Sequence, residues 1–464
     1  MISRHATTLV ATTVTPDAVA GPADPLRVAA GPRDRVHASG AENLLADDTI
    51  AIVLAGGKGT RLDPLTRHVC KPALPFGAGY RSIDFSLANC VNSGIRRVGV
   101  ATQHKPEALL NHLDGVWRNV VTDPRHFIAP WPAQEGAPGG YRGTADAVYR
   151  NLEIIEELDR RLVLILAGDH VYKMDYRPML QQHCERGAAV TIGCVEVPLD
   201  DAHQFGVLSA DHHGRIDRFV EKPKTAAEIP SGDRVLASMG IYVFDADLLA
   251  RVLRLDAFSI GSGHDFGRDV LPRLIRDADA FAWQFRASDG VQSAYWRDIG
   301  TIDAYWRAHM ELLGPSPRMR LDDPDWPLPA GDAPRTIGHR HDWKQRGVVE
   351  DSLIAGGCTV GGAVRRSVLF EGVEVSRRAE ISDAVILPGA VIGAGCRLRG
   401  VIVDSGSRIP DGTVIDRSAS GTVPIERLKP VVLTADEAKD ALPHLRVRAR
   451  LSAALGIATH ASRA

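Results

Sequence analysis

The chain has 464 residues, a formal net charge of −2, 44% hydrophobic residues and 24% charged residues. This length favours two domains, and the composition is ordinary for a globular protein. The near-neutral charge gives no electrostatic footprint for nucleic acid or an acidic membrane surface, so we expect neither as a partner. No apolar run reaches the ~18 residues that a transmembrane helix requires.

The cysteines are scattered and form no C-x-x-C pair, so the sequence indicates neither a zinc site nor a disulfide framework. They are Cys70, Cys90, Cys184, Cys194, Cys358 and Cys396. In a chain of this size, scattered cysteines are typical of reduced thiols, and we expect a cytoplasmic protein.

The first 48 residues differ in composition from the rest of the chain. They are rich in Ala, Thr, Pro, Asp and Arg, show no clear period, and lack the continuous apolar core of a secretory signal. We expect residues 1–48 to form a disordered extension. A start codon assigned too far upstream would give the same composition.

Residues 49–320 are predicted to form an α/β domain with a Rossmann-like, mainly parallel sheet. Strand-like runs that are continuously apolar and β-branched, as in strands buried on both faces, alternate with helical patterns. The strand-like runs are IAIVLA, RRVGVAT, LVLILAGD and AAVTIGCVEV, and the helical stretches include RSIDFSLANCVNSG and TADAVYRNLEIIEEL.

The Pro-rich stretch DDPDWPLPAGDAP predicts a linker over residues 321–346. Beyond it, a small or apolar residue recurs every six positions from residue 373 to residue 409, with Arg397 as an exception, and glycines stand at the corners. The recurring residues are Val373, Ala379, Val385, Val391, Val403 and Ile409. This period is typical of a parallel β-helix, which we place at 347–425 with a tail at 426–464. An antiparallel domain of short strands is the weaker alternative.

A glycine-rich turn follows the first strand-like run, in the stretch IAIVLAGGKGTRL. A P-loop requires Ser or Thr after Gly-Lys, and here Gly59 follows Lys58; a dinucleotide fingerprint requires glycine where Leu62 stands. Glycines let backbone N–H groups approach a phosphate, and Arg61 and Lys71 add positive charge nearby. The turn therefore predicts phosphate binding of neither common type.

The extended string AGGKGTRLDPLT…KP resembles the signature of the sugar nucleotidyltransferases, which join a nucleoside triphosphate to a sugar 1-phosphate. Further segments narrow the resemblance to the bacterial glucose-1-phosphate adenylyltransferases. They are YRSIDFSLANCVNSGIRRVGVATQ, YRGTADAVYRNLEII, LAGDHVYKMDY, FGVLSAD, FVEKP, ASMGIYVFDAD, HDFGRDVLP and YWRDIGT. The resemblance covers about residues 50–415 in register. It implies an α/β catalytic domain, a C-terminal left-handed parallel β-helix and a homotetramer.

The reaction that the resemblance implies is transfer of AMP from ATP to α-D-glucose 1-phosphate, giving pyrophosphate and ADP-glucose for glycogen (α-glucan) biosynthesis. Both substrates are polyanions, so catalysis depends on positioning and charge neutralisation. The resemblance also implies Mg²⁺ as cofactor, with Asp169 and Asp298 as ligands, and Mg²⁺ prefers a few carboxylates together with phosphate oxygens. Asp169 ends a strand-like run, where α/β proteins bind ligands; in isolation it would more simply be a helix N-cap.

Roles for other residues follow from the same resemblance. Arg61 stabilises the triphosphate and the leaving pyrophosphate, Lys71 contacts a phosphate, and Lys222 pairs with the sugar phosphate; with Asp169 these are the expected catalytic residues. The expected sugar-phosphate contacts are Tyr141, Gly206, Glu221, Lys222 and Ser238. The expected nucleotide contacts are Ala55, Gly56, Gly57, Gly59, Thr60, Arg61, Gln103, Gln134 and Gly143.

The sequence departs from the enterobacterial relatives at the positions that bind phosphorylated effectors. Cations expected there are replaced by His68, Val69, Pro75 and Glu156 or Glu157, and Arg81 is the one that clearly remains. Gly140 also precedes Tyr141 where relatives often carry tryptophan. Since a polyanion site weakens as cations are lost, we expect phosphorylated effectors to act weakly or differently.

Two alternatives stay open at this point. One is a glucose-1-phosphate nucleotidyltransferase that uses another nucleoside triphosphate, such as UTP or dTTP, since the motif core is shared. The other is a non-catalytic regulatory subunit of the same fold, against which the intact Arg61, Lys71, Asp169, Lys222 and Asp298 argue.

Overall fold

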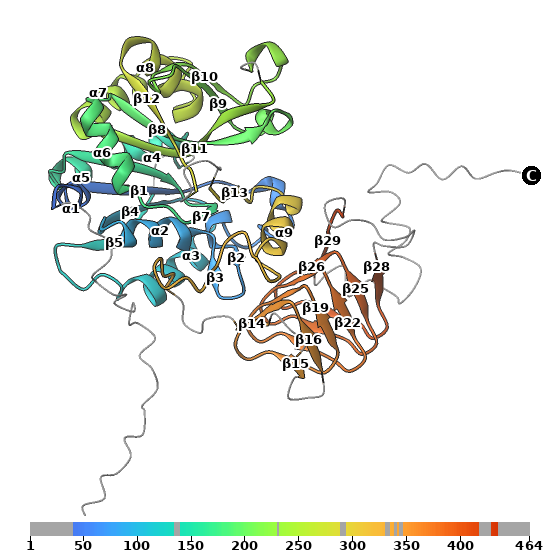
Figure 1. The fold of residues 1–464 in the computed structure, drawn as a ribbon. Helices are drawn as coiled ribbons and strands as arrows, with labels where there is room; N and C mark the ends of the chain where they lie inside the picture. The colour runs from blue at the N-terminus through green and yellow to red at the C-terminus, as the bar shows by residue number, and fades with distance from the viewer. Residues whose placement is uncertain are drawn as a thin grey trace, which may run out of the picture.

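The computed structural model describes residues 40–133, 140–229, 232–287, 294–329, 335–337, 341–342, 347–416 and 428–434. Figure 1 shows an α/β domain beside a stack of short strands near the C-terminal end of the chain. Every helix in the described ranges is too short or too polar to cross a bilayer.

The central sheet of the α/β domain runs in the order β10-β9-β11-β6-β1-β4-β5, with β8 added on β11 and β12 on β8. Its strands are β1 (Thr49–Ala55), β4 (Arg97–Thr102), β5 (Phe127–Pro132), β6 (Leu162–Ala167), β8 (Val190–Pro198), β9 (Gly206–Ala210), β10 (Ile216–Glu221), β11 (Arg234–Asp245) and β12 (Ala280–Gln284). β1 lies parallel to β4 and β6, and β4 to β5, whereas β11 runs antiparallel to its neighbours. The mainly parallel sheet predicted from the sequence is confirmed.

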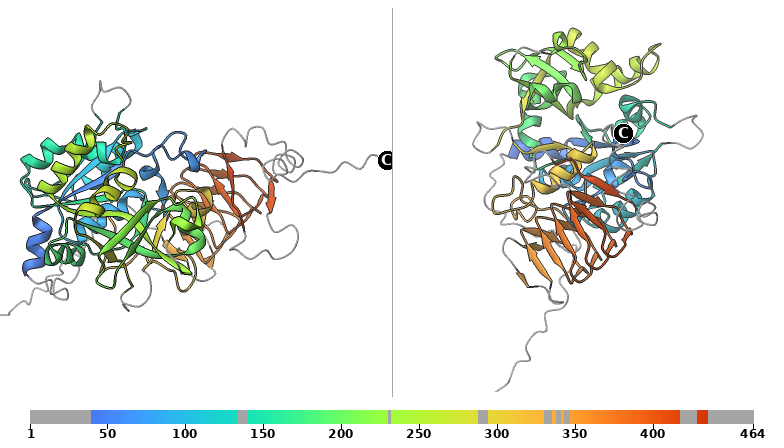
Figure 2. Two further views of the ribbon diagram at one scale, coloured as in Figure 1. Left: turned by 90° about the horizontal axis from the view of Figure 1, so that it is seen from above. Right: turned by 90° about the vertical axis from the view of Figure 1, so that its right-hand side faces the viewer.

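Helices cover both faces of this sheet (Figures 1 and 2). Residues of α4 (Thr144–Tyr149), α5 (Leu152–Glu157), α7 (Ala246–Ala257) and α8 (Leu271–Asp277) share a buried apolar cluster with one face. Residues of α2 (Ile83–Asn92), α3 (Glu107–His112), α6 (Arg177–Arg186) and α9 (Ile302–Met310) share a cluster with the other. Smaller strands, β2 (Pro75–Phe76), β3 (Tyr80–Arg81), β7 (His170–Tyr172) and β13 (Trp296–Asp298), lie outside the central sheet.

A helix that precedes β1 corrects the predicted N-terminal boundary. α1 spans Gly40–Asp47, and its Ala46 is buried in the core. Arg97 donates hydrogen bonds to the carbonyl and the carboxylate of Asp47, at 2.8 and 3.0 Å. Residues 40–48 therefore belong to the α/β domain, because tertiary packing stabilises a helix too short to show a clear period. The rest of the predicted extension, residues 1–39, lies outside the described residues.

The C-terminal domain is built from three parallel sheets, as the six-residue period predicted. The first holds β14 (Arg335–Ile337), β17 (Ser352–Ile354), β20 (Val368–Leu369), β23 (Val385–Ile386), β26 (Val401–Val403) and β29 (Val431–Leu433). The second holds β15 (His341–Asp342), β16 (Val348–Glu350), β19 (Ala363–Arg365), β22 (Glu380–Ser382), β25 (Arg397–Arg399) and β28 (Val414–Asp416). The third holds β18 (Thr359–Val360), β21 (Glu374–Val375), β24 (Val391–Ile392) and β27 (Arg408–Ile409). Among the described strands of this domain, only β14 and β15, at its start, pair antiparallel.

The exception at Arg397 is explained by a side of the β-helix that is one residue shorter than the other two. The interior residues are Val375, Ile381, Ile386, Ile392, Leu398, Val403 and Ile409. They are separated by steps of six, five, six, six, five and six residues. A strict six-residue frame therefore slips by one position at each short side, and in β25 it selects the exposed Arg397 instead of the buried Leu398.

The two domains share a continuous core. Leu353, Val368 and Phe370 of the β-helix belong to the same buried cluster as α9. The Trp306 indole N–H of α9 donates a hydrogen bond to the Asp383 carbonyl at 2.9 Å. The β-helix is therefore fixed against the α/β domain by buried contacts rather than held only by the connecting chain.

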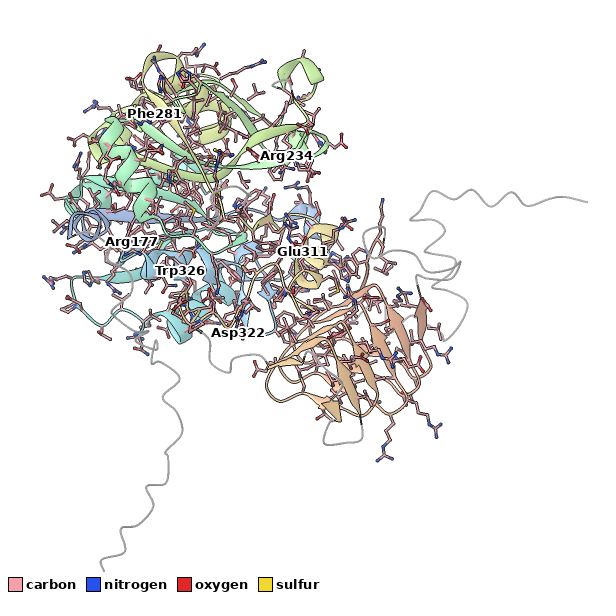
Figure 3. All side chains as sticks on the ribbon, viewed as in Figure 1. Arg177, Arg234, Phe281, Glu311, Asp322 and Trp326 are labelled. Carbon is pink, nitrogen blue, oxygen red and sulfur yellow. The ribbon has the colours of Figure 1, made fainter. Side chains whose placement is uncertain are left out.

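The predicted linker and tail are both partly built into the fold. Trp326, which Figure 3 labels on the α/β domain, donates its indole N–H to Asn89 Oδ1 at 2.7 Å, and Asn92 donates to the Pro327 carbonyl at 2.9 Å. Residues 321–329 therefore pack on the α/β domain. β29, inside the predicted tail, pairs with β26 and extends the β-helix; residues 417–427 and 435–464 lie outside the described residues.

Candidate active site

The glycine-rich turn leaves the end of β1 at Ala55 and leads into a 3₁₀-helix, Thr60–Leu62. Gly59 has a φ of +64°, and a Cβ there would lie 2.9 Å from Thr66 Cγ2, so this position requires glycine. The Thr66 hydroxyl donates to the Gly59 carbonyl at 2.9 Å and fixes the turn. Gly57, Thr60 and Arg61 are exposed, so the turn presents backbone and a guanidinium to solvent.

Gln103 connects this turn to the segment that carries Tyr141. β4 lies beside β1 in the sheet, so Gln103, which follows β4, lies against Gly56: a Cβ on Gly56 would be 3.2 Å from its Oε1. Its Nε2 donates to the Tyr141 carbonyl at 3.3 Å. The Tyr141 hydroxyl is buried, donating to the Trp131 carbonyl at 3.1 Å. Gln134 lies outside the described residues.

Lys71 lies between the two aspartates predicted as metal ligands. Its Nζ is 2.7 Å from Asp169 Oδ2 and 2.7 Å from Asp298 Oδ1, and its side chain is 8% exposed. Asp169 follows the end of β6, and Asp298 ends β13, which pairs antiparallel with β7 so that Asp298 faces His170. Chain segments far apart in sequence thus bring one ammonium and two carboxylates together.

Arg61 extends this charged cluster towards the glycine-rich turn. A Cβ on Gly300 would lie 3.1 Å from Arg61 Nη2 and 2.9 Å from Asp298 Oδ1, so both groups border the same glycine. A Cβ on Gly59 would lie 3.5 Å from the Lys71 Cβ. The structure therefore places Arg61, Lys71, Asp169 and Asp298 around one end of the turn.

The charges of the cluster stabilise one another. Burial alone would lower the pKa of Lys71, but Asp169 and Asp298 outweigh it and raise that pKa above its usual value. Burial would likewise raise the pKa of Asp298, but Lys71, with His170 and Arg61, lowers it to about 2. At neutral pH the cluster therefore contains an ammonium and an ionised Asp298.

Two carboxylates that converge on one point form an oxygen donor set that suits a hard divalent cation. Within the described ranges no cluster of three or more His, Cys, Asp or Glu residues is gathered to hold a metal. Asp169 and Asp298, which meet at Lys71 Nζ, could supply part of the ligands of a divalent cation, with phosphate and water supplying the rest.

The second group of predicted residues gathers where β9 and β10 pair. Gly206 opposes Glu221 in that pairing, and a Cβ on Gly206 would lie 2.8 Å from Glu221 Oε2. A Cβ on Gly267 would lie 2.5 Å from the same oxygen, so the carboxylate passes between two glycines. Lys222, with a φ of +47°, turns its exposed ammonium to Glu221 Oε1 at 2.8 Å.

Ser238 links this group to the Lys71 cluster. A register shift in the pairing of β11 with β8 follows Ser238, and the Gly240 N–H donates to its hydroxyl at 3.2 Å. A Cβ on Gly240 would lie 3.6 Å from His170 Cε1. Ser238 Oγ also lies 3.5 Å from the hydroxyl of Tyr242. β11 therefore connects the two groups: it pairs with β9 of the second group, and its Gly240 borders His170, which lies next to Asp169 of the Lys71 cluster.

Sequence reasoning missed three residues that the structure places at the site: His170, Tyr242 and Gly267. His170 lies 3.6 Å from Asp169 and packs edge-on against Trp296. All three lie in the quoted segments LAGDHVYKMDY, ASMGIYVFDAD and HDFGRDVLP. The signal was present, but only the sheet pairings and the turn geometry show which side chain in each segment reaches the site.

Comparison with known proteins agrees with this architecture. Residues 50–314 match the nucleotidyl transferase family, and residues 334–420 match the GlmU-like C-terminal hexapeptide family. A glucose-1-phosphate adenylyltransferase of Alkalilimnicola ehrlichii is 48% identical over 376 residues, which cover 80% of this chain and 89% of that protein. The glucose-1-phosphate adenylyltransferase of Methylococcus capsulatus is 48% identical over 377 residues, with the same coverage of 80% and 89%.

A third relative, the glucose-1-phosphate adenylyltransferase of Paraburkholderia phytofirmans, is 46% identical and covers 80% of this chain and 91% of its own length. The two family matches extend across both domains, in the order in which the fold presents them. The chain therefore belongs to the glucose-1-phosphate adenylyltransferases, a branch of the nucleotidyl transferase family.

Proposed function

We propose that the protein transfers AMP from ATP to α-D-glucose 1-phosphate, forming ADP-glucose and pyrophosphate. The observation that carries the proposal is the cluster of Lys71, Asp169 and Asp298, with Arg61 beside it, at the end of a glycine-rich turn. Together with a divalent cation, such a cluster suits the binding of a triphosphate, because the charges of Lys71 and Arg61 and of the two carboxylates offset each other. The names of the relatives supply the identity of both substrates.

The reaction is an in-line displacement. A phosphate oxygen of glucose 1-phosphate attacks the α-phosphorus of ATP, a new P–O bond forms, and the bond to the bridging oxygen breaks to release pyrophosphate. The attacking oxygen is already anionic, so no general base is required. The roles of the chain are to hold the two polyanions in line and to neutralise charge at the leaving group.

The two ends of the site bind different substrates, the triphosphate at one end and the sugar phosphate at the other. The backbone of Gly56–Thr60 and the Arg61 guanidinium bind the triphosphate, and Arg61 stabilises the leaving pyrophosphate. Lys71 contacts a phosphate oxygen. Lys222 exchanges Glu221 for the phosphate of the sugar. Glu221 then accepts hydrogen bonds from sugar hydroxyls, and the Ser238 hydroxyl donates or accepts them. Ser238 is buried and Glu221 is half-buried, and polar groups shielded from water discriminate between sugars, because an analogue that lacks a hydroxyl leaves them unpaired.

Members of this family generally use a divalent metal, and we propose Mg²⁺ for this chain. Asp169 and Asp298 would hold it, since both carboxylates lie 2.7 Å from the same atom, Lys71 Nζ, and are therefore close to each other. When bound, Mg²⁺ supplies positive charge that shields the triphosphate.

The test is pyrophosphate release by the purified protein with glucose 1-phosphate, Mg²⁺ and each of ATP, UTP, dTTP, CTP and GTP. A rate specific to ATP is expected, and Asp169→Asn should abolish it without changing assembly. Preference for another nucleotide would keep the mechanism and change the product. No rate with any nucleotide, from a folded protein, would favour a regulatory subunit.

Regulation by phosphorylated effectors is expected to be weak. Arg81, the cation that remains at the predicted effector positions, is partly buried, which lowers the pKa of its guanidinium, and it donates to the Ala73 carbonyl. Glu156 is paired with Arg254 at 2.7 Å. Titration with fructose 1,6-bisphosphate and AMP should change the rate little; activation at micromolar concentration with AMP antagonism would contradict this.

Two further properties are proposed with the function. A homotetramer is expected by similarity to the family, and light scattering of the purified protein tests it. A cytoplasmic location is supported by six cysteines that are all free thiols in the structure.

A further inference from the structure

His264 is a buried residue that the proposed mechanism does not use. It lies in the loop between α7 and the short helix Phe266–Val270, and its Nδ1 is 2.8 Å from Asp256 Oδ2. The side chains of His264 and Asp256 are 7% and 6% exposed. The Ser262 hydroxyl donates to Asp256 Oδ1 at 2.7 Å and accepts the His264 N–H at 3.0 Å. These three residues form a closed ring that fixes the loop.

The backbone of His264 is held in a conformation that it would rarely adopt alone. Its φ of +54° lies in the left-handed region, which a residue other than glycine occupies only when its surroundings impose it. This conformation points the His264 carbonyl at the start of α4, where it accepts the N–H groups of Ala145 at 2.8 Å and Asp146 at 3.3 Å. Gly143, the N-cap of α4, provides no side-chain cap, so the His264 carbonyl satisfies these N–H groups instead.

Gly143 allows this approach. A Cβ there would lie 2.3 Å from the His264 carbonyl oxygen, so the two backbones are in direct contact. The segment fixed in this way is the one that carries Tyr141 and Gly143, both predicted to contact substrates.

The next residues of the loop reach the sugar-phosphate side of the site. The Thr144 hydroxyl donates to Asp265 Oδ2 at 3.0 Å and accepts the Phe266 N–H at 2.9 Å. Gly267 then packs against the Glu221 carboxylate, which a Cβ on Gly267 would approach to 2.5 Å. The loop around His264 therefore sets the spacing between the start of α4 and Glu221.

We propose that His264, held by Asp256, is a positioning residue for the sugar-phosphate pocket. It touches neither substrate; it fixes the loop that orients Glu221 on one side and the Tyr141 segment on the other. The inference relies on the proposed function only for the identity of the sugar phosphate that binds there.

The first test is steady-state kinetics of His264→Ala. The KM for glucose 1-phosphate should rise about tenfold, and the KM for ATP should rise less, because Glu221 and Tyr141 lie on the sugar side and only Gly143 is predicted to contact the nucleotide. Asp256→Ala should give the same shift, and the double variant should add little, as expected for residues that act as one unit. The matched control is His183→Ala, which removes another buried histidine. His183 lies in α6, and its Nδ1 is hydrogen-bonded to the Thr191 hydroxyl at 2.9 Å. This variant should leave both KM values unchanged.

Hydrogen–deuterium exchange tests the positioning without turnover. Peptides that cover residues 143–146 and 219–222 should exchange faster in His264→Ala than in the wild type, and not in His183→Ala. If His264→Ala does not fold, Asp256→Asn should show a smaller change in the same peptides. Unchanged exchange in these peptides would overturn the inference. A wild type that turns over no nucleotide with glucose 1-phosphate would refute the proposed function alone, since exchange still decides the role of His264.

Discussion

The two ends of the candidate site contain the same chemical pair, an ammonium beside a carboxylate, in different surroundings. Lys71 lies 2.7 Å from Asp169 and from Asp298 with its side chain 8% exposed. Lys222 lies 2.8 Å from Glu221 with its side chain 55% exposed. The contact distances are nearly equal, so burial distinguishes the two. A buried group left without its partner is costly, whereas an exposed pair is screened by water and exchanges partners readily.

This comparison suggests that the two ends of the site have different roles. The Lys71 cluster is part of the fold as well as of the site, so its geometry is set before substrate arrives. The Glu221–Lys222 pair has little influence on folding, and Lys222 is free to leave Glu221 for a phosphate group. Changes at the first end should therefore alter both stability and chemistry, and changes at the second end should alter substrate affinity.

The largest expected effect on stability is that of Lys71→Met. Removing the ammonium leaves two partly buried carboxylates facing each other, which should lower the free energy of unfolding by about 3 kcal/mol in urea denaturation. Millimolar Mn²⁺ should restore part of this loss in the variant, because a cation that binds the folded state stabilises it.

The matched control is Lys173→Met, which removes a lysine that pairs with Asp323 at 3.3 Å and is 12% exposed. It should also lower stability, but Mn²⁺ should not reverse the loss. A Lys71→Met protein as stable as the wild type would contradict the importance of burial.

An intermediate effect is expected for Asp298→Asn under acidic conditions. The pKa of Asp298 is lowered from 3.8 to about 2 in the folded protein. The stability that this shift contributes, about 2 kcal/mol, is present above pH 4 and is lost as the pH falls through about 2.

Urea denaturation at a series of pH values should therefore show a steeper acid loss for the wild type than for Asp298→Asn. Asp114→Asn, at an exposed pair with Arg118, is the control and should follow the wild type. Parallel curves for the wild type and Asp298→Asn would show that the ion pairs of this cluster contribute nothing to folding.

The smallest expected effect on stability is that of Lys222→Met. Because the pair with Glu221 is exposed, its loss should change the free energy of unfolding by no more than about 0.5 kcal/mol. Thermal denaturation by circular dichroism measures this. A loss as large as that of Lys71→Met would remove the distinction between the two ends.

The regions of the molecule also differ in how much of their structure can be predicted from the sequence. The sheet, the β-helix and the glycine-rich turn were predicted because burial on both faces, a six-residue period and turn chemistry leave local patterns. α1 was missed because eight residues carry too little period, and tertiary packing stabilises it. The strict six-residue frame selected Arg397 because sequence alone does not show which side of a coil is shorter.

The site shows a similar limit. Resemblance supplied Lys71, Asp169 and Asp298 as separate roles. That Lys71 pairs with both aspartates depends on the antiparallel pairing of β7 with β13, which joins segments more than a hundred residues apart. His264 begins the quoted segment HDFGRDVLP, but its role was not predicted, because that role depends on a backbone conformation and on a helix distant in sequence.

The most direct test of the central claim is a kinetic matrix of pyrophosphate release over both substrates for the wild type, Lys71→Met and Lys222→Met. Lys71→Met should lower kcat by about a thousandfold, as expected when a charge-stabilising group is removed. Lys222→Met should raise the KM for glucose 1-phosphate by about tenfold to a hundredfold, the value of a charged hydrogen bond, with the KM for ATP nearly unchanged. The same changes in kcat and KM in both variants would contradict the account, because they would mean that the two ends of the site have the same role in the reaction.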